Sequence, residues 1–161
     1  MTDQTKVDAL RSTRLAAELS ADELHSLADL ATLFDLKQGE ILAHEGAIDN
    51  HLYAILSGTL GVVKSPGTPD EVMINTLSAG DFMNEMGFMD GSEAYASKVA
   101  LGATRVLALE REKLESLVDV HPWIVYRVMR AIIRGVHQIQ RRLSMQQAEL
   151  SNYIYKQHGK Y

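Results

Sequence analysis

Residues 80–100 hold the side chains whose types and spacing could bind a small ligand. Two turn signals built from Gly and Asp, at 80–81 and 90–91, bracket a short apolar segment with one carboxylate, Glu85. Residues 96–101 then have the pattern of a strand. A loop, one helical turn, a loop and a strand form a concave site, and the free N–H groups at the start of such a turn can bind an anion.

Other kinds of chemistry find no support in the residue types. The chain has no cysteine, which excludes disulfides, iron–sulfur clusters and a thiol nucleophile. Its six histidines show no zinc-binding spacing, so no metal site is predicted, and His44 is the one histidine that we would test for a haem or metal role. No Gly-rich nucleotide motif and no Ser, His and carboxylate arrangement stands out. The chain is therefore predicted not to be an enzyme.

Length and composition indicate one ordinary globular domain. The 161 residues are 46% hydrophobic and 23% charged, enough for one domain with a core. The net charge of −5 argues against a general nucleic-acid or anionic-membrane surface. No apolar run reaches the ~20 residues that a membrane-spanning helix needs, and the N-terminus has no signal-peptide core. A cytoplasmic protein without membrane contact is predicted.

Helices and strands on both sides of residues 80–100 must hold that segment in position. The apolar spacing predicts a short helix over 7–19 and a second helix that starts at Ser20, where Glu23 completes a capping box. Residues 34–77 are short segments broken by turn residues, a pattern typical of a β-sandwich or barrel. The strand-like runs are 52–56, 59–63 and, beyond the candidate site, 105–109.

A long helix is predicted from Pro122 to Leu150, about 44 Å at ~1.5 Å per residue. It carries a seam with spacings of 3, 4, 3, 4, 3 and 4, made of Met129, Ile132, Val136, Ile139, Leu143, Gln146 and Leu150. Such a seam predicts a homodimer, with contacts through Met129, Ile132, Val136, Ile139 and Leu143. The alternative is a helix folded back onto its own domain.

A basic stripe runs along the same helix. Arg127, Arg134 and Arg141 share one heptad position, with Arg130 and His137 beside them. The stripe is either a solvated flank of the coiled coil or the source of an arginine, Arg134, that approaches Glu85.

Taken together, these motifs resemble the cyclic nucleotide-binding domain family, the catabolite activator protein-like β-roll. The match in the phosphate-binding cassette consists of Gly80, Asp81, Phe82, Glu85, Met86, Asp90, Gly91, Ala96 and, conservatively, Ser97. Residues 39–42, 45–46 and 52–58 also fit. The resemblance implies a mainly β protein, a jelly-roll β-roll (double-stranded β-helix) with N-terminal helices and a long C-terminal dimerisation helix. The divisions expected are 1–33 helical, 34–118 β-roll, 119–150 dimer helix and 151–161 tail.

The cassette departs from the family pattern where the ligand would be held. The arginine that pairs with the cyclic phosphate falls on Ala94, the hydroxyl residue after it on Tyr95, and the first glycine on Asn84, whereas Glu85 is kept. Either the ligand differs, or another cation substitutes, or nothing binds. A lost charge-assisted hydrogen bond is worth roughly 1.5–3 kcal/mol. The predicted site residues are Asn84, Glu85, Met86, Ala94 and Tyr95 from the cassette, with Arg134 from the basic stripe.

The function that follows is a stand-alone regulatory sensor of the cyclic nucleotide-binding type. It would bind a cyclic nucleotide or another small phosphorylated or anionic ligand and signal through the dimer helix. The alternative is a degenerate, ligand-free dimeric adaptor. Family members that regulate transcription carry a DNA-binding domain after the long helix, and only eleven residues follow Leu150. DNA binding by this chain alone is not expected, and its output would be a protein partner in trans.

Overall fold

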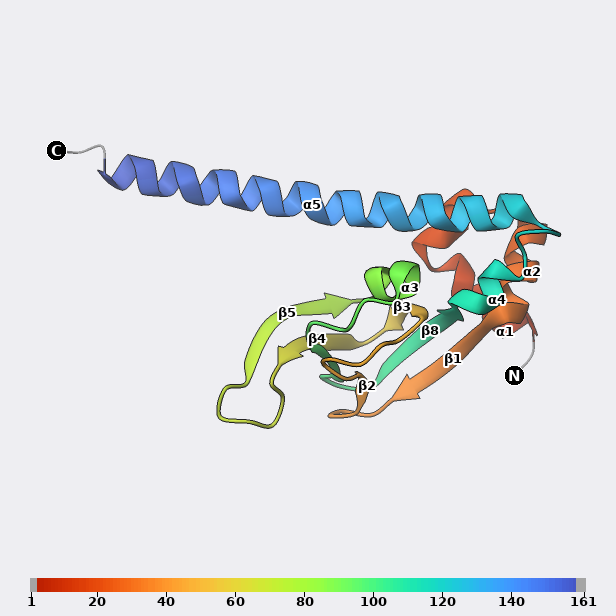
Figure 1. Ribbon diagram of the computed structural model, residues 1–161, viewed down its shortest axis with the longest axis horizontal. Coiled ribbons are helices and arrows are strands. Elements are labelled where there is room, and N and C mark those ends of the chain that lie inside the picture. The colour runs from red at the N-terminus through yellow and green to blue at the C-terminus, as the bar shows by residue number, and fades with distance from the viewer. Residues whose placement is uncertain (1–2, 159–161) are drawn as a thin grey trace.

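The computed structural model describes residues 3–158, which form two four-stranded antiparallel sheets with helices before and after them (Figure 1). The strands are β1 (Ala31–Leu36), β2 (Ile41–Ala43), β3 (His51–Ser57), β4 (Thr59–Lys64), β5 (Val72–Ser78), β6 (Phe82–Met83), β7 (Ser97–Ala100) and β8 (Thr104–Glu110). The helices are α1 (Asp3–Arg11), the 3-10 helix η1 (Arg14–Glu18), α2 (Ala21–Leu30), α3 (Glu85–Asp90), α4 (Arg111–Glu115) and α5 (Pro122–His158). The predicted β-roll is confirmed.

The first sheet has the order β1-β8-β3-β6, and its central strands β8 and β3 are covered on both faces, whereas the second sheet has the order β2-β7-β4-β5. Alternate residues of β3 belong to two different cores. Leu52 and Ala54 pack with the helices, and Tyr53 and Ile55 pack into a second core with Leu60 of β4. A strand buried on both faces needs a continuous apolar run, which explains the uninterrupted run over 52–56.

The N-terminal helices pack against the first sheet. The predicted capping box is present, because the Ser20 hydroxyl accepts from the Glu23 N–H at 3.3 Å and the Glu23 carboxylate accepts from the Ser20 N–H at 2.8 Å. The single helix predicted over 7–19 is instead broken into α1 and η1. At the break the Thr13 hydroxyl donates to the Leu10 carbonyl, a local bond that competes with helix continuation. The first strand begins at Ala31, three residues before the predicted boundary.

Helix α5 begins at Pro122 as predicted but runs to His158, through most of the segment that we expected to be a separate tail. At ~1.5 Å per residue its 37 residues extend for about 55 Å. Figure 1 shows its first turns over the N-terminal helices and its second half extending past the β-roll. From Val136 to residue 156 every side chain is exposed. The α5 residues of the buried core therefore come from the beginning of this helix.

The heptad seam is divided between two environments. Ile132 is only 2% exposed and belongs to the core with Ile124 and Val128, and Met129 packs against the same core. These two residues are therefore not free for the dimer contact that was predicted for them. The exposed members of the predicted contact are Val136, Ile139 and Leu143.

The basic stripe holds α5 against the N-terminal helices. Arg130 forms an ion pair with Glu18 at 2.9 Å, and Arg134 pairs with the same carboxylate. Arg127 pairs with Glu23. The Glu18 side chain is 5% exposed between its two arginines. The prediction that Arg134 approaches Glu85 is therefore wrong, since η1 supplies a nearer carboxylate.

Candidate ligand-binding site

Asn84 sets the geometry at the start of α3. Its backbone is left-handed, with φ 66° and ψ 29°, a conformation that glycine and asparagine tolerate best. Its side-chain Nδ2 donates to the carbonyls of Asp49 and His51 at 2.8 and 2.7 Å. The residue that replaces the family's glycine thus keeps the backbone turn and adds two bonds that tie α3 to the segment entering β3.

Close packing under α3 explains a second glycine. A Cβ atom on Gly87 would lie 2.6 Å from the Asn84 Oδ1 atom and 2.7 Å from the Asp49 carbonyl oxygen. A larger residue at 87 would therefore displace either the Asn84 amide or the backbone at Asp49. Both contacts fix where Glu85 begins the helix.

A cavity of about 330 Å³ lies beside α3 and is the candidate ligand site. Its walls come from β4, β5, the segment 82–87, the segment 92–98 and the middle of α5. The polar and aromatic residues that line it include Asn75, Asn84, Glu85, Ser92, Glu93, Tyr95, Lys98 and Arg142. Of the residues predicted for the site, the structure places Asn84, Glu85, Met86, Ala94 and Tyr95 on its wall. Arg134 is absent from that wall.

The backbone at Ala94 is held on both sides. Its N–H donates to the Ala47 carbonyl at 2.9 Å, and its carbonyl accepts from the Gly46 N–H at 2.7 Å. The backbone at the position that carries arginine in the family is therefore held in place. This chain differs there only in its side chain, because alanine has no charge.

Lys98 on β7 is a cavity residue that sequence reasoning missed. Its side chain is largely buried, with the residue 7% exposed. Its Nζ donates to the Ala96 carbonyl at 3.0 Å and lies 4.8 Å from the centroid of the Tyr95 ring. The available signal was a lysine within an otherwise apolar strand pattern at 96–101, four residues after Ala94.

Glu85 and Lys98 bring opposite charges to the same cavity. Burial raises the pKa of the Glu85 carboxyl, and the Lys98 ammonium acts against that rise. Burial lowers the pKa of Lys98, and the Glu85 carboxylate acts against that fall. In both groups desolvation is the largest influence, so the two charges compensate each other only in part.

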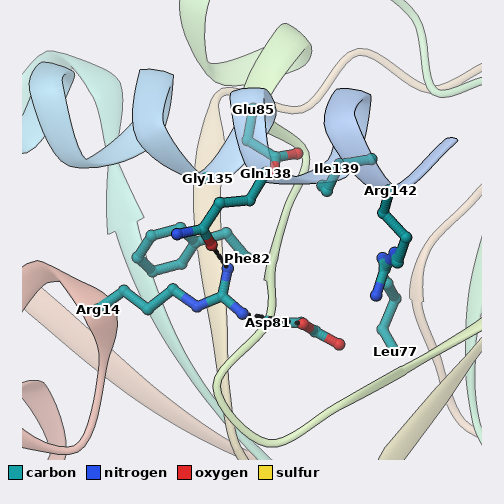
Figure 2. Close-up of a pocket in the computed structure, with 9 residues that line it drawn as sticks. All are labelled: Arg14, Leu77, Asp81, Phe82, Glu85, Gly135, Gln138, Ile139 and Arg142. Atoms are coloured by element: carbon teal, nitrogen blue, oxygen red, sulfur yellow. Dashed lines mark hydrogen bonds and ion pairs between the residues drawn. The ribbon is translucent and has the colours of Figure 1, made fainter. Parts of the chain in front are cut away.

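Helix α5 closes the cavity from the opposite side through Ile139 and Arg142. Figure 2 shows a smaller adjoining pocket, of about 130 Å³, in which Arg142 reaches from α5 toward Leu77 of β5. In the same view Arg14 of η1 donates to the Gln138 Oε1 atom at 2.9 Å and lies 3.7 Å from the Asp81 carboxylate.

Gly135 lies where α5 passes Phe82 of β6. It is the only glycine of the helix, and a Cβ at its position would lie 3.4 Å from the Phe82 ring, an ordinary contact distance. A substituent larger than a methyl group would add volume at this crossing. Glycine at this position also weakens the helix by itself.

The two sheets, α3 and the long C-terminal helix define a β-roll of jelly-roll type. A model of the cyclic nucleotide-binding domain matches residues 33–121, more than half of the chain. The chain belongs to the cyclic nucleotide-binding domain family.

Individual relatives agree with this assignment. The chain is 27% identical over 118 residues to the cGMP-dependent protein kinase, isozyme 1, of Drosophila melanogaster, which covers 71% of this chain and 15% of the kinase. It is 29% identical over 115 residues to the cAMP-activated global transcriptional regulator CRP of Salmonella typhimurium, which covers 71% of this chain and 51% of the regulator. The chain thus spans about half the length, or less, of these curated relatives.

A solved structure shows the same fold. A cyclic nucleotide-binding domain from Methylobacillus flagellatus superposes with a TM-score of 0.77 at 23% identity, over 87% of this chain and 80% of that one.

Among the side chains that the structure describes, those of residues 4–156, no three His, Asp or Glu groups lie together so that they could hold a metal ion. His44 is exposed on the turn after β2. None of the helices formed by these residues combines the length and the apolarity needed to cross a bilayer.

Proposed function

We propose that this chain is a regulatory sensor that binds a cyclic nucleotide or a related small anion in the 330 Å³ cavity and reports binding through α5. The observation that carries the proposal is that Ile139 and Arg142 of α5 line the same cavity as Glu85 of α3. A ligand there would contact the β-roll and the helix together. Any difference in its affinity for two positions of α5 would shift the population between them.

The relatives support a regulatory role of this kind. One is named as a cGMP-dependent kinase and another as a cAMP-activated transcriptional regulator. We assign this chain the binding step and no catalytic step of its own. Its output would be a protein partner in trans, and with a net charge of −5 we assign it no DNA contact. A cytoplasmic location stays a prediction.

A homodimer through the second half of α5 is part of the proposal. Val136, Ile139 and Leu143 are exposed, and Leu150 continues their spacing at 66% exposure. An apolar seam on a helix that its own domain leaves uncovered is best buried by a second copy of the same helix. Dimerisation would then restrict α5 at the point where it borders the cavity.

The test is a thermal-shift panel of cyclic mono- and dinucleotides, followed by calorimetry of any ligand that responds. A ligand that binds only the folded protein must raise its melting temperature, by an amount that grows with concentration. We expect a rise with at least one cyclic nucleotide and a smaller rise in Glu85→Gln. If no member of the panel shifts the transition at millimolar concentration, the sensor reading is wrong.

The second candidate is a dimeric adaptor without a ligand. It is favoured by an apolar pocket of about 300 Å³ on the outer side of α3 and α5, where Met86, Met89, Ile133 and Val136 are exposed. The adaptor predicts that a polar change on this outer face, Ile133→Asp, alters self-association or partner binding, while Glu85→Gln changes neither. The sensor predicts a ligand response that depends on Glu85.

A further inference from the structure

We infer that Lys98 is the cation that holds the ligand, and that the ligand is a small organic molecule with an anionic group and a hydroxyl group. The inference rests on the proposed function, because it names the chemistry of the same cavity. It assigns to β7 a charge that the cassette position Ala94 does not carry.

The ammonium of Lys98 is buried with its donors mostly unused. Of its three N–H groups, one donates to the Ala96 carbonyl, and the Tyr95 ring adds a cation–π contact. Among residues 3–158, no carboxylate forms an ion pair with it. A buried charge without a partner is strongly unfavourable. A ligand anion in the cavity would supply the missing partner.

Glu85 does not take that place. Its charge acts on Lys98, yet the two form no ion pair, and burial disfavours the charged form of each, raising the pKa of Glu85 and lowering that of Lys98. A carboxylate is an acceptor, so Glu85 suits a ligand hydroxyl rather than a ligand anion. The cavity therefore offers a cation for one end of a ligand and an acceptor for another.

The other charged groups on the cavity wall are less suited to hold an anion. Arg142 and Glu93 are both exposed, and their charges oppose each other. An exposed guanidinium is screened by water and salt, whereas a buried ammonium is fixed in place and interacts in a lower dielectric. Arg142, on α5, would add its charge after the anion is bound at Lys98.

The test compares a charged and a neutral ligand on the same variants. Lys98→Met removes the charge and keeps a long apolar side chain, Lys98→Arg keeps the charge, and Lys113→Met on α4 is the surface control. The probes are cyclic AMP, cyclic GMP and adenosine, measured by calorimetry. In Lys98→Met we expect the affinity for the cyclic nucleotides to fall at least about tenfold, as for the loss of one charge-assisted bond. The affinity for adenosine should change little, and Lys98→Arg should recover part of the loss.

The outcomes separate this inference from the proposed function. Suppose that the wild type binds cyclic nucleotides. If Lys98→Met weakens the affinity for cyclic nucleotides and for adenosine equally, or changes neither affinity, Lys98 is not the anion partner although the sensor role stands. If the wild type binds no cyclic nucleotide, the sensor role fails for these ligands. Anion binding at Lys98 is then measured directly, by following the NMR signals of lysine 13Cε groups during titration with inorganic phosphate. Titration with sodium chloride is the ionic-strength control.

The NMR signal of Lys98 is identified by its loss in Lys98→Arg. Phosphate should shift this signal and raise the pH at which it titrates, because a bound anion favours the charged ammonium. A Lys98 signal that responds to phosphate no more than to chloride overturns the inference.

Discussion

At the residue scale, the Glu85 carboxyl group lies on the cavity wall, where burial disfavours its charged form. Burial raises the pKa of Glu85, so the folded protein holds this proton more tightly than the unfolded chain. The stabilising contribution of the protonated form is complete below the unfolded pKa, near 4.5, and is lost as the pH rises through the folded pKa. At neutral pH the ionised Glu85 therefore weakens the fold.

The first prediction is that Glu85→Gln, without ligand, raises the melting temperature at about pH 7 relative to wild type. The gain should shrink as the pH is lowered and nearly disappear below 4.5, where wild-type Glu85 is mostly protonated even in the unfolded chain. Melting curves between about pH 4 and pH 7 measure this, with Glu149→Gln on exposed α5 as the control for losing one charge. A gain that does not depend on pH would contradict the assigned cause.

A second prediction concerns Ala94. Its backbone is already bonded to Gly46 and Ala47, so Ala94→Arg should add a guanidinium to the cavity wall without moving the main chain. We expect cyclic AMP to bind about ten- to a hundredfold more tightly, the effect of one additional charge-assisted contact. Calorimetry decides, and Ala94→Gln, which has length but no charge, is the matched control. An equal gain in both variants would show that volume, not charge, was missing.

At the element scale, α5 is attached to the domain by ion pairs as well as by its core residues. Glu18 of η1 accepts from both Arg130 and Arg134, and its side chain is almost fully covered. Removing a covered carboxylate leaves two arginines without their partner. The N-terminal helices thus fix the direction in which α5 leaves the domain.

The third prediction follows from this attachment. Glu18→Ala should lower the melting temperature by a few degrees and increase the mobility of α5 near the cavity, since the helix loses its polar contact with η1. Thermal unfolding gives the first effect, and hydrogen exchange in residues 130–140 gives the second. Glu149→Ala, on the exposed half of the same helix, should leave both unchanged. A variant that melts like wild type would show that the core residues alone hold α5.

The sequence predicted the positions of helices and strands better than it predicted which parts of the protein cover them. The capping box at Ser20, the strand runs of the roll and the start of α5 at Pro122 all depend on local signals, and the structure confirms them. The seam on α5 has a period, but a period does not say what covers the face. Ile132 therefore proved to be a core residue of its own domain.

The site shows the same limit. Asn84, Glu85 and Tyr95 could be placed by their position in a cassette, because residues adjacent in sequence stay adjacent in a turn. Arg142 reaches the cavity from a helix far along the chain, and only the packing of α5 beside the β-roll brings it to the wall. Lys98 is three residues after Tyr95, but the strand pattern did not show that its side chain lines the cavity. The ion pair between Arg134 and Glu18 was likewise invisible, since their contact spans 116 positions.

At the scale of the whole molecule, the apolar seam on the second half of α5 is exposed in a single copy of the chain. The fourth prediction is that the protein is a dimer and that Leu143→Asp with Leu150→Asp makes it monomeric. Both leucines are exposed in one chain, so the double variant should keep its fold while two charges prevent burial of the seam. We expect the dimer dissociation constant to rise at least about a hundredfold.

Light scattering measures the dimer, and circular dichroism checks that the fold is intact. Met145→Asp is the matched control, because it adds a charge to an exposed apolar position on another face of the same helix. A double variant that remains dimeric would place the contact elsewhere, and a monomeric wild type would remove the dimer from the proposal.

The burial of the strands predicts how fast backbone amide protons exchange with solvent in each part of the molecule. Strands β3 and β8 are covered on both faces, whereas nearly all of β5 and the side chains of α5 from Val136 to residue 156 are exposed. Exchange with solvent should therefore be slowest in β3 and β8 and fastest in β5 and late α5. Leu77 of β5 and Ile139 of α5 are two walls of the cavity. The cavity can thus open by fluctuation of its least protected walls while Lys98 and Glu85 stay in place, and a bound ligand should slow exchange at Leu77 and Ile139 first.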